Sequence, residues 1–151
     1  MAELKERLRA DLNTAMRARD QVRMRTLRMA LTSITNEEVA GAAARDLSDD
    51  EIVKVLTREA RKRREAAEAF SAAGRTDQAA AERAEGEILA DYLPAQLSDD
   101  ELAALVDAAI AETGASGMAS MGQVMKTVTP TVAGRADGAR VAAEVRRRLS
   151  G

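Results

Sequence analysis

The chain has 151 residues, a net charge of −2, and neither cysteine nor histidine. These absences exclude disulfides, thiolate and histidine-dependent catalysis, and the usual zinc, haem and iron–sulfur ligands, so we expect no metal and no cofactor. The apolar stretches fall far short of the ~20 residues of a membrane helix, and the first residues do not resemble a signal peptide. We therefore expect a cytoplasmic protein that does not contact membranes.

The apolar residues recur at spacings of three and four, which predicts an all-α fold. Phe70 and Tyr92 are the only aromatic residues. Proteins that read single-stranded RNA by stacking bases need several aromatic rings together. Any contact with RNA should therefore be made through phosphates and shape.

Two amphipathic helices are predicted first. The apolar face of the first helix is formed by Leu4, Leu8, Leu12 and Met16. Asp20 has a side chain suited to a helix N-cap, so the second helix should begin there and end near Gly41.

The third helix has the clearest start signal. Ser48 and Glu51 have the spacing of a capping box, in which each side chain accepts a hydrogen bond from the other residue's backbone. The pattern continues to Gly74, which predicts a helix of about 26 residues, or ~39 Å at ~1.5 Å per residue. Asp77 should cap a fourth helix that ends before Pro94.

Three shorter helices should follow. The capping signal returns at Ser98, and we interpret the two copies as good helix caps rather than as an internal repeat. We assign the acidic residues 99–101 to this helix start and not to a metal site. The next helix, residues 121–132, should kink or stop near Pro130, and Asp137 should cap the last one.

These elements predict two domains. Residues 1–94 should form an N-terminal helical domain of four helices, one of them long. Residues 95–151 should form a compact three-helix C-terminal domain, with the boundary in the proline-bearing stretch 93–97.

Charge is distributed unevenly in the C-terminal part. Residues 95–113 carry five acidic side chains and no Lys or Arg, whereas residues 114–151 have a net charge of +4. The glycine-bearing stretch 134–138 precedes a helix N-terminus, where an anion can bind. The candidate nucleic-acid site consists of Lys126, Arg135, Gly138 and Arg140. The alternative is an ordinary loop followed by a helix cap.

A secondary basic patch lies in the N-terminal part. Its members are Arg23, Arg25, Arg28, Arg58 and Arg61. The alternative is a solvated surface, because Glu65 follows Arg61 at i+4 and compensates part of the charge. Arg63 falls in the middle of an apolar stripe, so it should either extend its head to water or pair with a buried carboxylate.

Several separate segments resemble the YqeY family. They are Tyr92–Ser98, Gly114–Ser116, Met121–Met125, Gly134–Gly138 and the N-terminal Leu27–Met29. In this family the C-terminal helical domain is similar to the tail of GatB, a subunit of the aspartyl/glutamyl-tRNA amidotransferase, where it contacts tRNA. The kinase-like catalytic region of GatB has no counterpart here, so the resemblance does not imply a carbon–nitrogen ligase activity.

The resemblance implies a non-catalytic accessory protein that binds tRNA or a tRNA-handling enzyme complex. The alternative is a protein-interaction adaptor with no RNA role, which would associate through an apolar patch. An enzyme is the weakest reading, because no spacing of the remaining polar residues suggests a catalytic site.

Overall fold

The computed structural model of the chain describes residues 2–150. Over this range it consists of seven α-helices and one short 3-10 turn, with no strand, so the all-α prediction is confirmed. The chain divides into two compact units, the first ending at Leu93 and the second beginning at Pro94.

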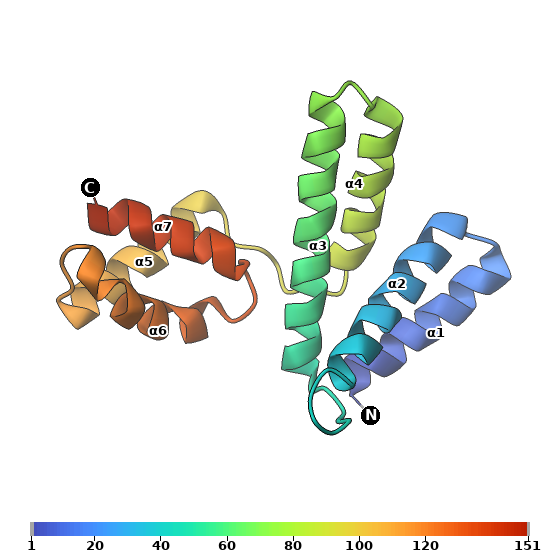
Figure 1. Cartoon of the computed structure of the whole chain (residues 1–151), viewed down its shortest axis with the longest axis horizontal. Helices are drawn as coiled ribbons and strands as arrows, with labels where there is room; N and C mark the ends of the chain where they lie inside the picture. Colours follow the sequence, from blue (N-terminus) through green and yellow to red (C-terminus); the bar gives the residue numbers. More distant parts are fainter. Residues whose placement is uncertain (1, 151) are drawn as a thin grey trace. The chain divides into compact units, whose positions relative to one another are not determined.

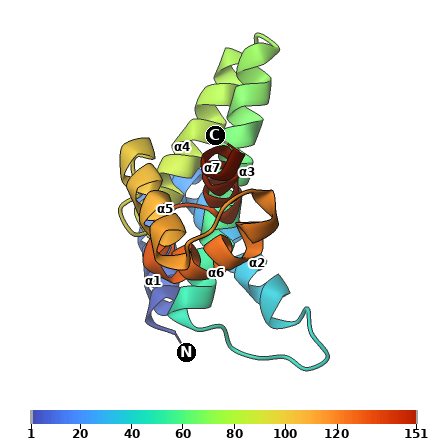
Figure 2. The same cartoon turned by 90° about the vertical axis from the view of Figure 1, so that its left-hand side faces the viewer.

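The first unit is built from two helical hairpins (Figure 1). One hairpin pairs α1 (Glu3–Ala18) with α2 (Gln21–Glu38), and the other pairs α3 (Asp49–Ala72) with α4 (Thr76–Ala90). A long exposed loop joins α2 to α3 (Figure 2). Where the hairpins meet, the buried residues are Leu8, Leu27, Ala30, Ile34, Leu47, Ile52, Val55, Leu56, Ile88, Leu89 and Tyr92.

Several polar contacts tie α1 into this unit. Lys5 forms a buried ion pair with Glu38 at the end of α2. The Tyr92 hydroxyl, just after α4, donates to Asp11 at 2.5 Å, and the Arg7 guanidinium lies 4.5 Å from the centre of the Tyr92 ring. Burial, with the hydrogen bond to Asp11 adding to it, raises the pKa of Tyr92.

The second unit contains α5 (Asp99–Thr113), the 3-10 turn η1 (Met118–Ser120), α6 (Met121–Val132) and α7 (Gly138–Ser150). The three α-helices pack on one another. Their shared core consists of Leu97, Leu102, Val106, Ala109, Val124, Val128, Val132, Ala136, Val141 and Val145.

The helix ends follow local chemistry in most places. Both capping boxes are present: Ser48 and Ser98 each accept from the N–H of the glutamate three residues on, and each glutamate accepts in return. Asp20 accepts from the Arg23 N–H at 3.1 Å, as predicted. The predicted cap at Asp77 is wrong, because α4 already begins at Thr76 and its N-cap, Arg75, makes no side-chain capping bond.

Two further details differ from the predictions. Met16 is 45% exposed, and Ala15 is buried in its place. Helix α6 runs through Pro130 to Val132. A proline this close to a helix end removes a single hydrogen bond, the one to the carbonyl four residues earlier, and the remaining turn tolerates that loss.

Candidate nucleic-acid interface

The loop between α6 and α7 closes the second unit. Ala133 and Gly134 both have left-handed backbone, at φ 48° and φ 81°. This conformation reverses the chain, so that the Arg135 guanidinium folds back onto the end of α6. Its Nε donates to the Val132 carbonyl at 3.1 Å and its Nη2 to the Thr131 carbonyl at 2.7 Å. These carbonyls lack helical partners, and Arg135 satisfies them.

The backbone of the same loop holds the start of the unit. The Leu97 N–H donates to the Arg135 carbonyl at 2.8 Å, and the Gln96 amide donates to the Gly134 carbonyl at 3.4 Å. Both the main chain and the side chain of Arg135 therefore serve the fold of the second unit.

The beginning of α7 is capped from within. The Asp137 carboxylate accepts from the Arg140 N–H at 3.0 Å, which is the predicted cap. The Arg140 guanidinium reaches Asp99 at 2.9 Å. The Asp99 side chain is 97% exposed, so this ion pair is screened by water and contributes little to stability. Gly138 is exposed at the first position of α7, and a Cβ there would meet open space.

Lys126 has a different environment from the two arginines. It is exposed on α6 and has no ion pair within residues 2–150. Residues three or four positions apart lie on the same face of a helix, and several exposed residues have these spacings from Lys126. This surface, which we call the α6 face, consists of Gly122, Gln123, Lys126, Thr129 and Pro130.

No carboxylate lies on or near the α6 face in sequence. Between Glu112 and Asp137 the chain contains neither Asp nor Glu. Amide and ammonium groups, such as those of Gln123 and Lys126, are among the groups that proteins use to contact nucleic-acid phosphates.

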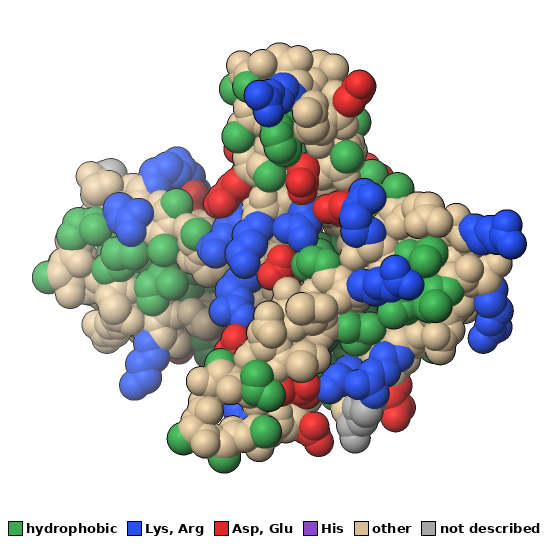
Figure 3. All heavy atoms as spheres, turned by 45° about the vertical axis from the view of Figure 1, so that its right-hand side comes forward, with side chains coloured by type: hydrophobic (Ala, Val, Ile, Leu, Met, Phe, Trp, Pro, Cys, Tyr) green, Lys and Arg blue, Asp and Glu red, His purple; other side chains and the backbone are tan. Residues whose placement is uncertain are grey.

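The secondary basic patch is largely compensated. The pairs are Arg23–Asp20 at 3.6 Å, Arg25–Glu85 at 2.8 Å, Arg58–Glu37 at 3.3 Å and Arg61–Glu65 at 3.9 Å. Of the five predicted residues, Arg28 has no ion pair within the described range. In the face of the molecule drawn in Figure 3, Asp and Glu side chains lie among many of the Lys and Arg side chains.

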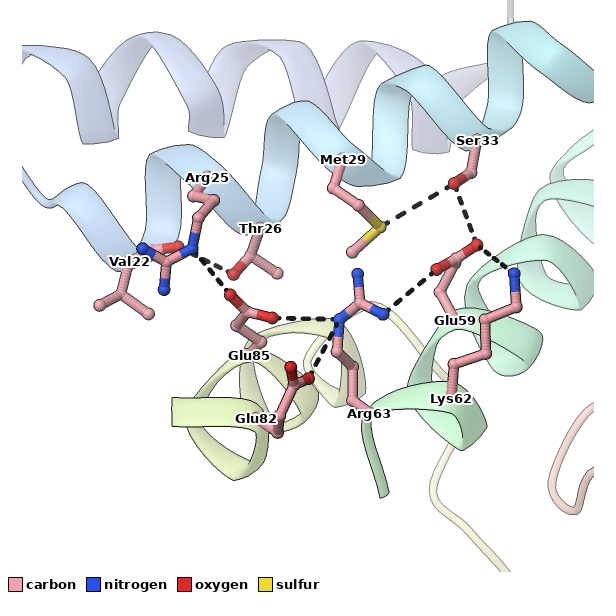
Figure 4. Close-up of polar contacts among 10 residues, drawn as sticks. All are labelled: Val22, Arg25, Thr26, Met29, Ser33, Glu59, Lys62, Arg63, Glu82 and Glu85. Atoms are coloured by element: carbon pink, nitrogen blue, oxygen red, sulfur yellow. Dashed lines mark hydrogen bonds and ion pairs between the residues drawn. The ribbon is translucent and has the colours of Figure 1, made fainter. Parts of the chain in front are cut away.

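Arg63 is the centre of a cluster that joins three helices of the first unit. Its Nε lies 3.1 Å from a Glu85 oxygen and 3.7 Å from a Glu82 oxygen of α4, and its Nη1 lies 3.6 Å from Glu59 of its own helix (Figure 4). From α2, Arg25 reaches Glu85 and the Ser33 hydroxyl donates to Glu59 at 3.0 Å.

The alternative in which Arg63 pairs with a buried carboxylate is therefore the one observed, since Glu59 is buried. Lys62 also pairs with Glu59, at 3.4 Å. The cluster therefore contains three cations and three carboxylates, namely Arg25, Lys62 and Arg63 with Glu59, Glu82 and Glu85. This balance suits a structural role: it allows charges to be partly desolvated between packed helices without leaving one unpaired.

Comparison with known protein families shows to which family the chain belongs. The family model described as Yqey-like protein matches residues 5–149. The chain belongs to the YqeY family. Comparison with curated proteins gave no match.

For this YqeY-family chain, sequence reasoning overlooked most of the α6 face. Charge and glycine content point instead to the loop before α7, whose carbonyls bond to Gln96 and Leu97. The signal that identifies the α6 face was present in the sequence as 24 consecutive residues without a carboxylate, residues 113–136.

The described part of this YqeY-family chain shows neither a cluster of metal ligands nor a membrane-spanning helix. Among residues 2–150, no group of three or more acidic side chains is arranged to hold a metal ion. No helix within the same range is long and apolar enough to cross a membrane.

Proposed function

We propose that this YqeY-family protein is a non-catalytic tRNA-binding protein that works alone or as an accessory to a tRNA-handling enzyme such as an amidotransferase. The observation that carries the proposal is the α6 face, where exposed Lys126 has no carboxylate partner among residues 2–150 and projects from a helix that contains neither Asp nor Glu. The sequence resemblance of the second unit to the tRNA-contacting tail of GatB supports the same function.

The chemistry expected is contact with phosphates. Lys126 supplies a positive charge and Gln123 supplies an amide that can donate to phosphate or ribose oxygens. The Thr129 hydroxyl already donates to the Met125 carbonyl at 2.6 Å, so it does not add a free donor. Gly122 is exposed, has no side chain, and has no other atom within 4 Å of the position of a Cβ. An RNA backbone could therefore approach the helix closely at this residue. Such contacts position RNA without reading its sequence, so binding should be salt-dependent.

The proposal is tested by titrating labelled total tRNA with the full chain, using fluorescence anisotropy at about 50 and 200 mM salt. Gln123→Glu adds one negative charge to the α6 face, and Ala104→Glu adds one to the exposed side of α5. We expect Gln123→Glu to weaken binding roughly tenfold through repulsion of phosphate, and Ala104→Glu to leave it nearly unchanged. Lys126→Glu should weaken it further.

Two results would contradict the proposal: no binding by the wild type even at the lower salt, or equal effects of the two added glutamates. The adaptor alternative predicts salt-tolerant association through an apolar patch. It has less support, because the exposed large hydrophobic side chains within the described range, Met16, Val22, Val39 and Met118, come from three separate stretches of the chain.

A further inference from the structure

The free end of the α1–α2 hairpin has an unusual turn. Helix α1 ends at Ala18, and Arg19 follows in left-handed backbone at φ 57° and ψ 34°. This is the position where helices commonly place glycine, because a Cβ is strained there. An arginine at this site keeps a long charged side chain at the extreme end of the hairpin.

The charge of this hairpin is not balanced by its own residues. Between Asp11 and Glu37 the only carboxylate is Asp20. Asp20 already accepts from the Arg23 N–H and pairs with the Arg23 guanidinium. The hairpin also carries three exposed arginines that make no ion pair within residues 2–150, namely Arg17, Arg19 and Arg28.

We infer that the α1–α2 hairpin is a second RNA-contacting surface, in which Arg17, Arg19 and Arg28 bind backbone phosphates. The inference rests on the proposed RNA-binding function and adds to it a site in the first unit. Guanidinium groups suit this task because their fixed fork of donors matches phosphate oxygens and stays charged at all physiological pH values.

The composition of the surface favours a polyanion over an acidic protein. A protein interface of ordinary size buries about 800 Å² on each side around an apolar, well-packed centre. Here the exposed large apolar side chains are Met16 and Val22, at 45% and 37% exposure. Toward the free end of the hairpin, at the right of Figure 3, Lys and Arg side chains surround a small hydrophobic area, and no carboxylate is visible at that end in this view.

The test compares two triple variants of the full chain in the same tRNA titration over a range of salt. The first changes Arg17, Arg19 and Arg28 to Gln. The control changes three cations that already have carboxylate partners, Arg45, Lys62 and Arg147, to Gln. Both remove three positive charges, so a difference between them reports contacts at the hairpin and not the net charge. Circular dichroism and the unfolding midpoint of each variant verify the fold.

We expect the hairpin variant to make the slope of log K against log salt shallower by about 2 to 3 units, at about 0.9 per duplex phosphate contact. The control should keep the wild-type slope. If the wild type binds and Gln123→Glu weakens it, but the hairpin variant behaves as the control does, the inference is wrong and the proposed function stands. If the wild type does not bind, both fail.

Discussion

Lys5 and Glu38 form a buried ion pair in the first unit. The Lys5 Nζ lies 2.7 Å from one Glu38 oxygen and 2.9 Å from the other, and both residues are buried. The Leu47 N–H also donates to Glu38, at 3.4 Å. One carboxylate thus connects the start of α1, the end of α2 and the end of the loop before α3.

Replacing Lys5 by Met should destabilise the first unit by about 3 kcal/mol, because it leaves the Glu38 charge buried with one backbone donor. Urea unfolding followed by circular dichroism measures the change. Lys54→Met is the matched control: Lys54 is exposed and has no ion pair within residues 2–150, so its loss should change the free energy of unfolding by less than about 0.5 kcal/mol. Equal effects would show that the Lys5 pair contributes nothing.

The same pair predicts a pH dependence. The hydrogen bond from Lys5 lowers the pKa of Glu38 below the ordinary value of 4.5, and this outweighs the opposing effect of burial. The folded state therefore binds the proton less tightly than the unfolded state. The stability that the ionised Glu38 carboxylate contributes is fully present above about pH 4.5, which is the pKa of this group in the unfolded chain. It is lost as the pH falls through the lower pKa of the folded state. Unfolding free energies measured between pH 3 and 7 should fall less steeply on acidification in Glu38→Gln than in the wild type.

Arg63→Met should destabilise the first unit by about 2 kcal/mol, less than for a fully buried pair because the Arg63 side chain is 18% exposed. The change leaves Glu59, Glu82 and Glu85 facing one another without their central cation. Added salt should recover part of the loss, since it screens repulsion between the carboxylates. A loss that salt does not alter would attribute the effect to packing alone. Arg83→Met, at an exposed position of α4, is the comparison.

The α6–α7 loop predicts two changes of opposite sign. Ala133 has left-handed backbone at φ 48°, so Ala133→Gly should stabilise the second unit by up to about 1 kcal/mol. Gly134→Ala, at φ 81°, should destabilise it by about 1 kcal/mol. Thermal unfolding of the two variants tests the assignment, and the same sign for both would contradict it.

Local signals were the part of the fold that sequence predicted best. A capping box is decided by residues three apart, so Ser48–Glu51 and Ser98–Glu101 were readable directly. Arg25 and Glu85 are 60 residues apart and meet only because α2 packs on α4. No periodicity encodes such a pair, which is why the secondary basic patch looked freer in the sequence than it is in the folded protein.

The candidate site shows the same limit. Charge and flexibility predict a site of four residues, yet the carbonyls of Thr131 and Val132 engage the Arg135 guanidinium, and Asp99 engages that of Arg140. Whether an arginine is free for a ligand depends on where unpaired carbonyls and carboxylates lie in space. The presence of Lys126 in a stretch without any carboxylate is, by contrast, a property of the sequence alone.

The bonds from Gln96 and Leu97 to the loop before α7 also determine where the chain can be cut. A fragment that starts at Ser98 would keep all three α-helices of the second unit, but it would lose the two donors that fasten the α6–α7 loop and the buried side chain of Leu97. Excised fragments should therefore begin no later than Pro94, although α5 itself begins five residues further on.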